Sequence, residues 1–257
     1  MSFPIALSIA GSDCCGGAGI QADLKTFQSL GVYGAAALTA ITAQNSRGVQ
    51  QAEALPPDLV VAQVDAVYAD LPVAAVKTGM LANAPVVEAV AAALGRWGAA
   101  KVVVDPVVFA KDGTRLLDEA GTGRLLHALL PLALLVTPNA PEAQVLSGVA
   151  ITGEAAARRA CRRLAGYGPR YVLLKGGHLP GDPVDLLYDG RRYHRLAYPR
   201  LEGVPVHGTG CTLSAAIAAY LARGLDPAAA VAAARDYLQG QIARAQALGG
   251  GWRLFVP

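Results

Sequence analysis

The chain of 257 residues is 53% hydrophobic and 16% charged, with a formal net charge of +3, and this composition excludes a disordered protein. Its arginines are scattered and lack interleaved aromatic residues, so we expect no nucleic-acid partner. No apolar run reaches the length of a bilayer span, and we expect neither a signal peptide nor membrane contact. We therefore expect one domain over residues 1–257 in the cytoplasm, with its four cysteines reduced.

Short apolar runs alternate with segments of helical periodicity, which is typical of β–α units that build a parallel sheet. We expect strands over residues 5–10, 35–41, 74–76, 101–104, 133–136 and 171–174. Residues 185–189 and 193–198 flank Asp189-Gly190, which predicts an antiparallel hairpin at the sheet edge. Helices are expected up to about Leu30, over 212–223 and over 227–247. The pattern predicts a three-layer α/β/α domain with a mostly parallel central sheet.

A polar or glycine-containing cluster follows each of the six expected parallel strands. The clusters are Gly11-Ser12-Asp13, Thr42-Ala43-Gln44-Asn45, Lys77-Thr78-Gly79-Met80, Asp105-Pro106, Thr137-Pro138-Asn139 and Lys175-Gly176-Gly177-His178. Because ligands bind at the carboxyl ends of parallel strands, these clusters can line one cleft. Ordinary loops also contain glycine and asparagine, but two lysines and an aspartate at strand ends favour a functional site.

The segment His207-Gly208-Thr209-Gly210-Cys211-Thr212 comes directly before an alanine-rich helix. Its glycines let backbone N–H groups converge at the helix N-terminus, where the helix dipole favours an anion. We expect this field to lower the pKa of the Cys211 thiol and to make it a base or a nucleophile. The alternative is a glycine-rich turn with an incidental buried cysteine.

The first glycine-rich loop, residues 11–19, lacks the G-x-G-x-x-G spacing of a dinucleotide site. Asp23, on the helix that follows, projects near the apolar face. A carboxylate there needs a partner. The partner is either a buried structural donor or an amine or ring nitrogen of a ligand.

A phosphoryl-transfer enzyme neutralises phosphate, holds a divalent cation and activates the acceptor hydroxyl. Lys175 is a candidate for phosphate, Asp105 and Glu142 for Mg²⁺, and the loop from Gly208 to Cys211 for the transferring group. No Gly-Lys dipeptide occurs, so the chain is not a P-loop kinase.

Eight motifs in order resemble those of the hydroxymethylpyrimidine/phosphomethylpyrimidine kinases of thiamine biosynthesis, a family in the ribokinase superfamily. They are Ala10-Gly11-Ser12-Asp13, Gly16 to Asp23, Thr42 to Asn45, Val76 to Met80, Asp105-Pro106-Val107, Thr137-Pro138-Asn139 with Glu142, Lys175 to His178 and His207 to Thr212. The resemblance implies a ribokinase-like fold and ATP- and Mg²⁺-dependent phosphorylation of 4-amino-5-hydroxymethyl-2-methylpyrimidine. It also implies phosphorylation of the monophosphate to the diphosphate, and a homodimer.

The resemblance assigns roles to matching positions. It implies that Cys211, Gly208, Gly210 and Lys175 are catalytic, that Gln44, Asp23, Gly11 and Met80 bind the pyrimidine, and that Asp105, Thr137, Asn139, Glu142, Lys175 and Thr209 bind the nucleotide, with Asp105 and Glu142 at the metal. Cys211 would accept the hydroxymethyl proton, and His207 is the rival base.

The chain departs from the family pattern at three places. Cys14-Cys15 stand where Pro or Ser is usual, Pro205-Val206 replace Asn-Thr, and the tail contains Gly249-Gly250-Gly251-Trp252. One alternative function is a pyridoxine or pyridoxal kinase of the same superfamily. Another is a cysteine-nucleophile acyl transferase or hydrolase, which needs an orienting His–Asp pair that the sequence does not reveal.

Overall fold

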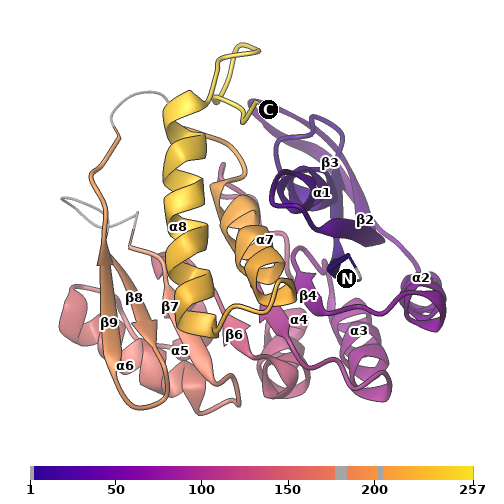
Figure 1. Ribbon diagram of the computed structural model, residues 1–257, viewed down its shortest axis with the longest axis horizontal. Helices are drawn as coiled ribbons and strands as arrows, with labels where there is room; N and C mark the ends of the chain where they lie inside the picture. The colour runs from indigo at the N-terminus through magenta and orange to yellow at the C-terminus, as the bar shows by residue number, and fades with distance from the viewer. Residues whose placement is uncertain (1–2, 177–183, 202–204, 257) are drawn as a thin grey trace.

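The computed structural model describes residues 3–176, 184–201 and 205–256. Their strands form one nine-stranded sheet in the order β3-β2-β1-β4-β5-β6-β7-β8-β9 (Figure 1). The strands are β1 (Ile5–Asp13), β2 (Tyr33–Asn45), β3 (Gly48–Ala54), β4 (Ala75–Thr78), β5 (Val102–Val104), β6 (Leu135–Val136), β7 (Tyr171–Leu174), β8 (Val184–Tyr188) and β9 (Tyr193–Ala197). Six neighbouring strands run parallel to one another, namely β2, β1, β4, β5, β6 and β7. The three remaining strands, β3, β8 and β9, pair antiparallel with their neighbours.

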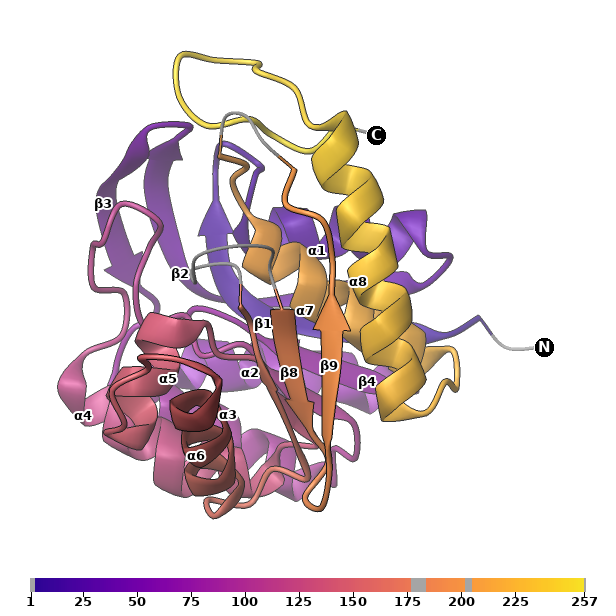
Figure 2. The same cartoon turned by 90° about the vertical axis from the view of Figure 1, so that its left-hand side faces the viewer.

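Helices cover both faces of the sheet, as the side view in Figure 2 shows. The helices are α1 (Gly19–Ser29), α2 (Pro57–Asp70), α3 (Ala84–Arg96), α4 (Glu119–Arg124), α5 (Ala140–Ser147), α6 (Glu154–Ala165), α7 (Thr209–Ala222) and α8 (Pro227–Arg244), with short helical turns over Leu125–Leu129 and Leu130–Leu132. One core cluster joins α1, α7 and α8 to the sheet, and a second cluster joins α2, α3, α5 and α6 to it. The expected three-layer architecture is therefore confirmed.

Sequence patterns explain the central strands and the helix boundaries. Val102, Val103 and Val104 are all fully buried, as a strand covered on both faces requires. Asn83 and Asp226 cap α3 and α8 by accepting hydrogen bonds from backbone N–H groups of the first turn. No helix in the described ranges has the length and hydrophobicity that crossing a bilayer requires.

The predicted hairpin is confirmed as β8 and β9, but a second hairpin at the opposite edge was not expected. β3 pairs with β2 across a turn at residues 45–48. Its central residues, 50–53, are all exposed and it carries no apolar alternation, so the periodicity that signals a strand is missing. β1 and β2 also extend through the polar clusters that we expected to follow them, and α8 ends at Arg244 instead of 247.

Candidate active site

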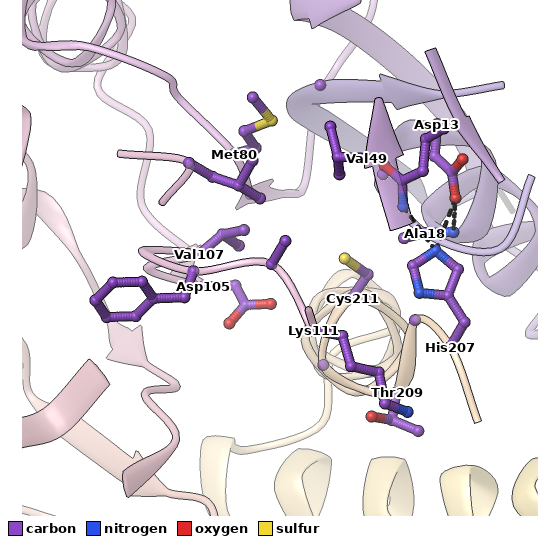
Figure 3. A pocket seen from close by; sticks show the side chains of 18 of the residues that line it. Asp13, Ala18, Val49, Met80, Asp105, Val107, Lys111, His207, Thr209 and Cys211 are labelled. Carbon is purple, nitrogen blue, oxygen red and sulfur yellow. Dashed lines mark hydrogen bonds and ion pairs between the residues drawn. The ribbon is translucent and has the colours of Figure 1, made fainter. Parts of the chain in front are cut away.

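A cavity of about 470 Å³ lies at the carboxyl ends of the parallel strands. Each of the six polar strand-end clusters contributes at least one residue to its lining, as the topology predicts. Eleven of the expected site residues line this cavity: Gly11, Gln44, Met80, Asp105, Asn139, Glu142, Lys175, Gly208, Thr209, Gly210 and Cys211. Figure 3 shows Met80 and Val107 on one side of the space, Asp13 and His207 on the other, and Cys211 between them.

Two glycine-rich loops meet at Cys211. Gly208 has a φ of +77°, and a Cβ atom there would overlap the carbonyl oxygen of Gly17, so this position requires glycine. The contact brings the N-terminus of α1 beside that of α7, and the backbone N–H of Gly19 donates a hydrogen bond toward Cys211. We expected an anion-binding site at the N-terminus of one helix, and the structure brings two helix N-termini together there, those of α1 and α7.

The expected fall in the pKa of Cys211 is wrong. Burial raises the pKa of this thiol to about 11, and although Lys77 lowers it, the carboxylates of Asp23 and Asp105 raise it further. The helix N-terminus does not offset burial and two nearby carboxylates. Cys211 therefore holds its proton near neutral pH in the protein without ligands.

Asp105 is the centre of a hydrogen-bonded group at the end of β5. Its Oδ1 lies 3.1 Å from Lys175 Nζ and accepts a hydrogen bond from Thr137 at 3.2 Å, and its Oδ2 accepts one from Ser214 at 3.2 Å. Although burial opposes a charge on Lys175, Asp105 and Glu142 raise its pKa, so the lysine stays cationic. The group thus holds the Lys175 ammonium, paired with Asp105, beside the N-terminus of α7.

Thr137 does not reach the cavity. Its side chain is fully buried and is directed to Asp105, so the expected nucleotide contact does not match its place in the structure. Thr137 orients Asp105 instead. Gly177 and His178, which complete the motif that begins at Lys175, lie outside the described residues.

Asn139 and Glu142 form a capping box at the start of α5. The Asn139 side chain accepts from the Glu142 N–H, and Glu142 Oε2 accepts from the Asn139 N–H, both at 2.9 Å. Glu142 is 3% exposed, and burial raises its pKa. A cation bound beside it would favour its ionised form.

A Mg²⁺ ion fits the donors at this end of the cavity. Within the described ranges no group of three or more His, Cys, Asp or Glu side chains gathers around one point. Mg²⁺ in phosphoryl-transfer sites needs only one or two carboxylates, because water and phosphate oxygens complete its shell. Asp105 and Glu142 both line the cavity and supply such a pair.

Asp23 lies beneath the cavity and does not line it. Its Oδ2 is 2.7 Å from Lys77 Nζ and accepts a hydrogen bond from Ser8 Oγ at 2.6 Å, and both charged side chains are fully buried. The expectation that Asp23 holds a substrate amino group therefore does not match its place in the structure, because the side chain is fully buried outside the cavity lining. Its Oδ2 is paired with protein donors, whereas its Oδ1 has no hydrogen-bond partner among the described residues. Its partner is the structural one that the sequence left open.

A His–Asp pair that the sequence did not reveal lies in the cavity wall. His207 Nε2 is 3.0 Å from Asp13 Oδ2 (Figure 3), and it is 2.9 Å from Nε2 of the Gln44 amide. Asp13 and His207 stand 194 positions apart, so no local pattern could have joined them. No hydrogen bond connects His207 to Cys211 in the described part of the chain, and the pair therefore does not form a nucleophile triad.

The three departures from the family pattern lie close to this wall. His207 stacks on Trp252 with ring centroids 5.4 Å apart, and the Arg253 N–H donates to the Pro205 carbonyl at 3.0 Å. Lys111, in the loop after β5, donates a hydrogen bond to the Val206 carbonyl and lies 5.3 Å from the Trp252 ring. Residues 205–206 are thus held by a backbone contact to Arg253, the residue that follows the tail segment 249–252, and by the side chain of Lys111. Cys14 donates to the Gln44 carbonyl at 3.1 Å and is exposed.

A second cavity of about 260 Å³ lies on the other side of the α7 N-terminus. Asn139, Lys175, Thr209 and Gly210 line both cavities. Its remaining wall includes Arg235, whose Nε lies 2.8 Å from Asp185 Oδ2. A cationic side chain and a helix N-terminus therefore separate two spaces that can each hold a small molecule.

Comparison with known proteins identifies relatives along nearly the whole chain. The model of the family described as phosphomethylpyrimidine kinase matches residues 13–254. A thiamine biosynthesis bifunctional protein, ThiED, of Geobacter sulfurreducens is 52% identical over 95% of this chain, which spans 50% of that protein's length. A hydroxymethylpyrimidine/phosphomethylpyrimidine kinase of Streptomyces coelicolor is 50% identical over 96% of this chain and 92% of its own.

The fold is also similar to solved structures. The pyridoxal kinase of Staphylococcus aureus in complex with ADP superposes with a TM-score of 0.92 at 35% identity, covering 100% of this chain and 94% of that one. The ribokinase-like architecture expected from the sequence is confirmed.

Proposed function

The chain belongs to the phosphomethylpyrimidine kinase family, and from this premise we propose that it phosphorylates 4-amino-5-hydroxymethyl-2-methylpyrimidine with ATP, and then the monophosphate to the diphosphate. The observation that carries the proposal is the wall shared by the two cavities. Lys175 and the start of α7 face both spaces, so an acceptor in the larger one and a nucleotide in the smaller one would meet there. In-line transfer between two bound molecules needs this arrangement.

The acceptor ring fits the larger cavity. Met80 and Val107 supply apolar contacts to a flat ring, Gly11 leaves room for it, and Gln44 supplies a polar edge. The hydroxymethyl group would then point to Cys211, which accepts its proton as the oxygen attacks. Cys211 must first lose its own proton to solvent in the cavity, because a neutral thiol cannot act as a base.

The transferring phosphoryl group would lie at the N-terminus of α7. Backbone N–H groups of residues 209–211 and the Lys175 ammonium stabilise the charge on its oxygens, and they need no reorganisation when charge develops. Thr209 and Asn139 line both cavities, which supports a contact with the nucleotide phosphates from the same end. Lys175 is kept cationic by Asp105, which favours this role.

Mg²⁺ would be held by Asp105 and Glu142, with water and phosphate oxygens as its other ligands. When bound, it neutralises the β- and γ-phosphate charge. Lys111 adds a cation on the acceptor side, beside the loop that leads into α7 (Figure 3). We assign it to the phosphate of the monophosphate acceptor, because Lys77 is fully buried in its pair with Asp23 and Lys175 is assigned to the transferring group.

We further propose that residues 1–257 form one kinase domain, that it is a homodimer and that it resides in the cytoplasm. One sheet receives every strand of the described residues, which favours a single domain. Sedimentation of the purified chain tests the dimer, and cell fractionation tests the location. A monomer at micromolar concentration would refute the first, and recovery in a membrane or secreted fraction the second.

The experiment that tests the activity is ATP-dependent ADP release with the aminopyrimidine alcohol and, separately, with pyridoxal at matched concentration. Similarity to a pyridoxal kinase of known structure favours pyridoxal as the second candidate. We expect a higher kcat/KM for the pyrimidine, because Gln44 can pair with its amino group. A clear preference for pyridoxal contradicts the proposal.

A further inference from the structure

Three polar side chains meet at one ring nitrogen in the cavity wall. His207 Nε2 lies 3.0 Å from Asp13 Oδ2 and 2.9 Å from Nε2 of the Gln44 amide. Asp13 is 2% exposed and His207 5%, so water competes little for these contacts. One ring nitrogen cannot donate to one neighbour and accept from the other. The proton on Nε2 therefore determines which end of the Gln44 amide faces His207.

Asp13 is an ionised carboxylate. Its Oδ2 accepts hydrogen bonds from the N–H groups of Gly17 at 3.1 Å and Ala18 at 2.8 Å, and its Oδ1 accepts one from Cys15 at 2.9 Å. Although burial opposes ionisation, His207 and the backbone donors lower the pKa of Asp13. Because a carboxylate only accepts, His207 Nε2 carries a proton and donates to Asp13.

The structure orients Nε2 of Gln44 toward His207 Nε2 and Oε1 toward Thr42, but two N–H donors would then face each other, so the amide must turn and present the acceptor Oε1 to His207. The other end of the amide lies 3.3 Å from Thr42 Oγ1, and Thr42 donates its single hydroxyl proton to the Ser12 carbonyl at 2.8 Å. The Thr42 oxygen is therefore available as an acceptor for an amide N–H. The two ends of a carboxamide have nearly the same shape, so its partners decide its orientation. Both partners favour Oε1 toward His207 and Nε2 toward Thr42.

In this orientation each end of the amide keeps one free position. Oε1 retains a lone pair and Nε2 retains a proton, and Gln44 lines the cavity. A ring whose amino group adjoins a ring nitrogen offers a donor beside an acceptor, and it can satisfy both. A ring without the amino group satisfies only one and leaves a polar atom unpaired, which costs binding energy.

We propose that Asp13 and His207 are positioning residues that lock the Gln44 amide in this orientation, and that this lock makes the cavity select an aminopyrimidine over a ring without the amino group. The inference rests on the proposed function and explains its substrate choice. His207 needs no contact with substrate for this role. Trp252 stacks on the His207 ring and holds its plane.

The test compares two variants of similar side-chain length, His207→Gln and His207→Met. Only glutamine places an N–H donor where the ring nitrogen lies. The readout is the ratio of kcat/KM for the aminopyrimidine alcohol to that for the same alcohol without the amino group. We expect the ratio to fall at least about tenfold in His207→Met, mainly through a higher KM for the amino substrate, and to stay within about threefold in His207→Gln.

Asp13→Ala provides a second route to the same effect. Without the carboxylate no acceptor holds the proton on Nε2 of His207, so Gln44 is free to turn and the ratio falls. Gln21→Ala is the matched control. Gln21 supports the same loop by accepting from the Asp13 N–H at 2.9 Å and donating to Ser12 Oγ at 2.7 Å, but its loss moves no proton on His207. Its ratio should equal that of the wild type.

Equal falls in the two His207 variants, or an unchanged ratio in His207→Met, overturn the inference. Thermal unfolding checks that each variant folds, and if Asp13→Ala does not fold, the two His207 variants decide. Failure of the wild type to phosphorylate the aminopyrimidine alcohol contradicts the proposed function instead. Calorimetric binding of the two rings to the wild type and the His207 variants then still measures the selectivity.

Discussion

The pH dependence of catalysis tests the role of Cys211, because the structure gives its thiol a pKa of about 11. A base acts in its deprotonated form, so raising the pH toward this value increases the active fraction. The thiolate makes up roughly 10⁻⁴ of Cys211 at pH 7 and roughly 10⁻² at pH 9. If Cys211 is the base, kcat/KM for the aminopyrimidine alcohol rises about 100-fold over this range.

Coupled ADP release at constant ionic strength measures this profile. Cys211→Ala should lower kcat by about 10² or more and remove the slope, since no thiolate remains to accept the proton. Cys161→Ala is the control, because Cys161 is a fully buried core thiol of α6 whose pKa is raised to about 12, and it should keep the slope. A flat profile in the wild type, or a slope that survives in Cys211→Ala, refutes the reasoning and transfers the role to another group.

Three further predictions concern the charges and the backbone around the cavity. Lys77→Met leaves the Asp23 carboxylate buried without its partner and should lower the free energy of unfolding, measured in urea, by about 3–5 kcal/mol. The double variant Lys77→Met, Asp23→Leu should recover most of this loss, and a loss below about 1 kcal/mol in Lys77→Met would contradict the prediction. Lys111→Met should lower kcat/KM for the monophosphate at least about tenfold more than for the alcohol, and equal losses in the two assays would exclude a role specific to the monophosphate. Gly208→Ala forces a Cβ atom against the Gly17 carbonyl at a φ of +77°, so both kcat and the midpoint of thermal unfolding should fall. A wild-type value of either would show that the loops at Gly17 and Gly208 do not meet as described.

The sequence predicted the parallel strands well, because continuously apolar runs such as residues 101–104 leave few alternatives to a buried strand. The hairpin β8–β9 was predicted from Asp189-Gly190. β3 was not, since its exposed polar residues carry no periodicity and its pairing with β2 is a tertiary contact. Local patterns predict elements that bury one face, and they fail where a strand is defined only by its neighbour.

In the site, too, local sequence patterns were predictive and contacts between distant segments were not. Residues at strand ends converge because the topology brings these ends together, so most of the expected lining residues were placed correctly. Side-chain partners were not predictable. The pairing of Asp23 with Lys77, the contact of Asp13 with His207 and the raised pKa of Cys211 all depend on burial and on contacts between distant segments.

The central claim is that an acceptor alcohol and ATP meet across the wall formed by Lys175 and the start of α7. The most direct measurement is mass analysis of products after incubation of the wild-type protein with ATP, Mg²⁺ and 4-amino-5-hydroxymethyl-2-methylpyrimidine. The account predicts the monophosphate first and the diphosphate after it, with one ADP released at each step. ATP hydrolysis without a phosphorylated pyrimidine, or phosphorylation of pyridoxal in clear preference to it, would contradict the account.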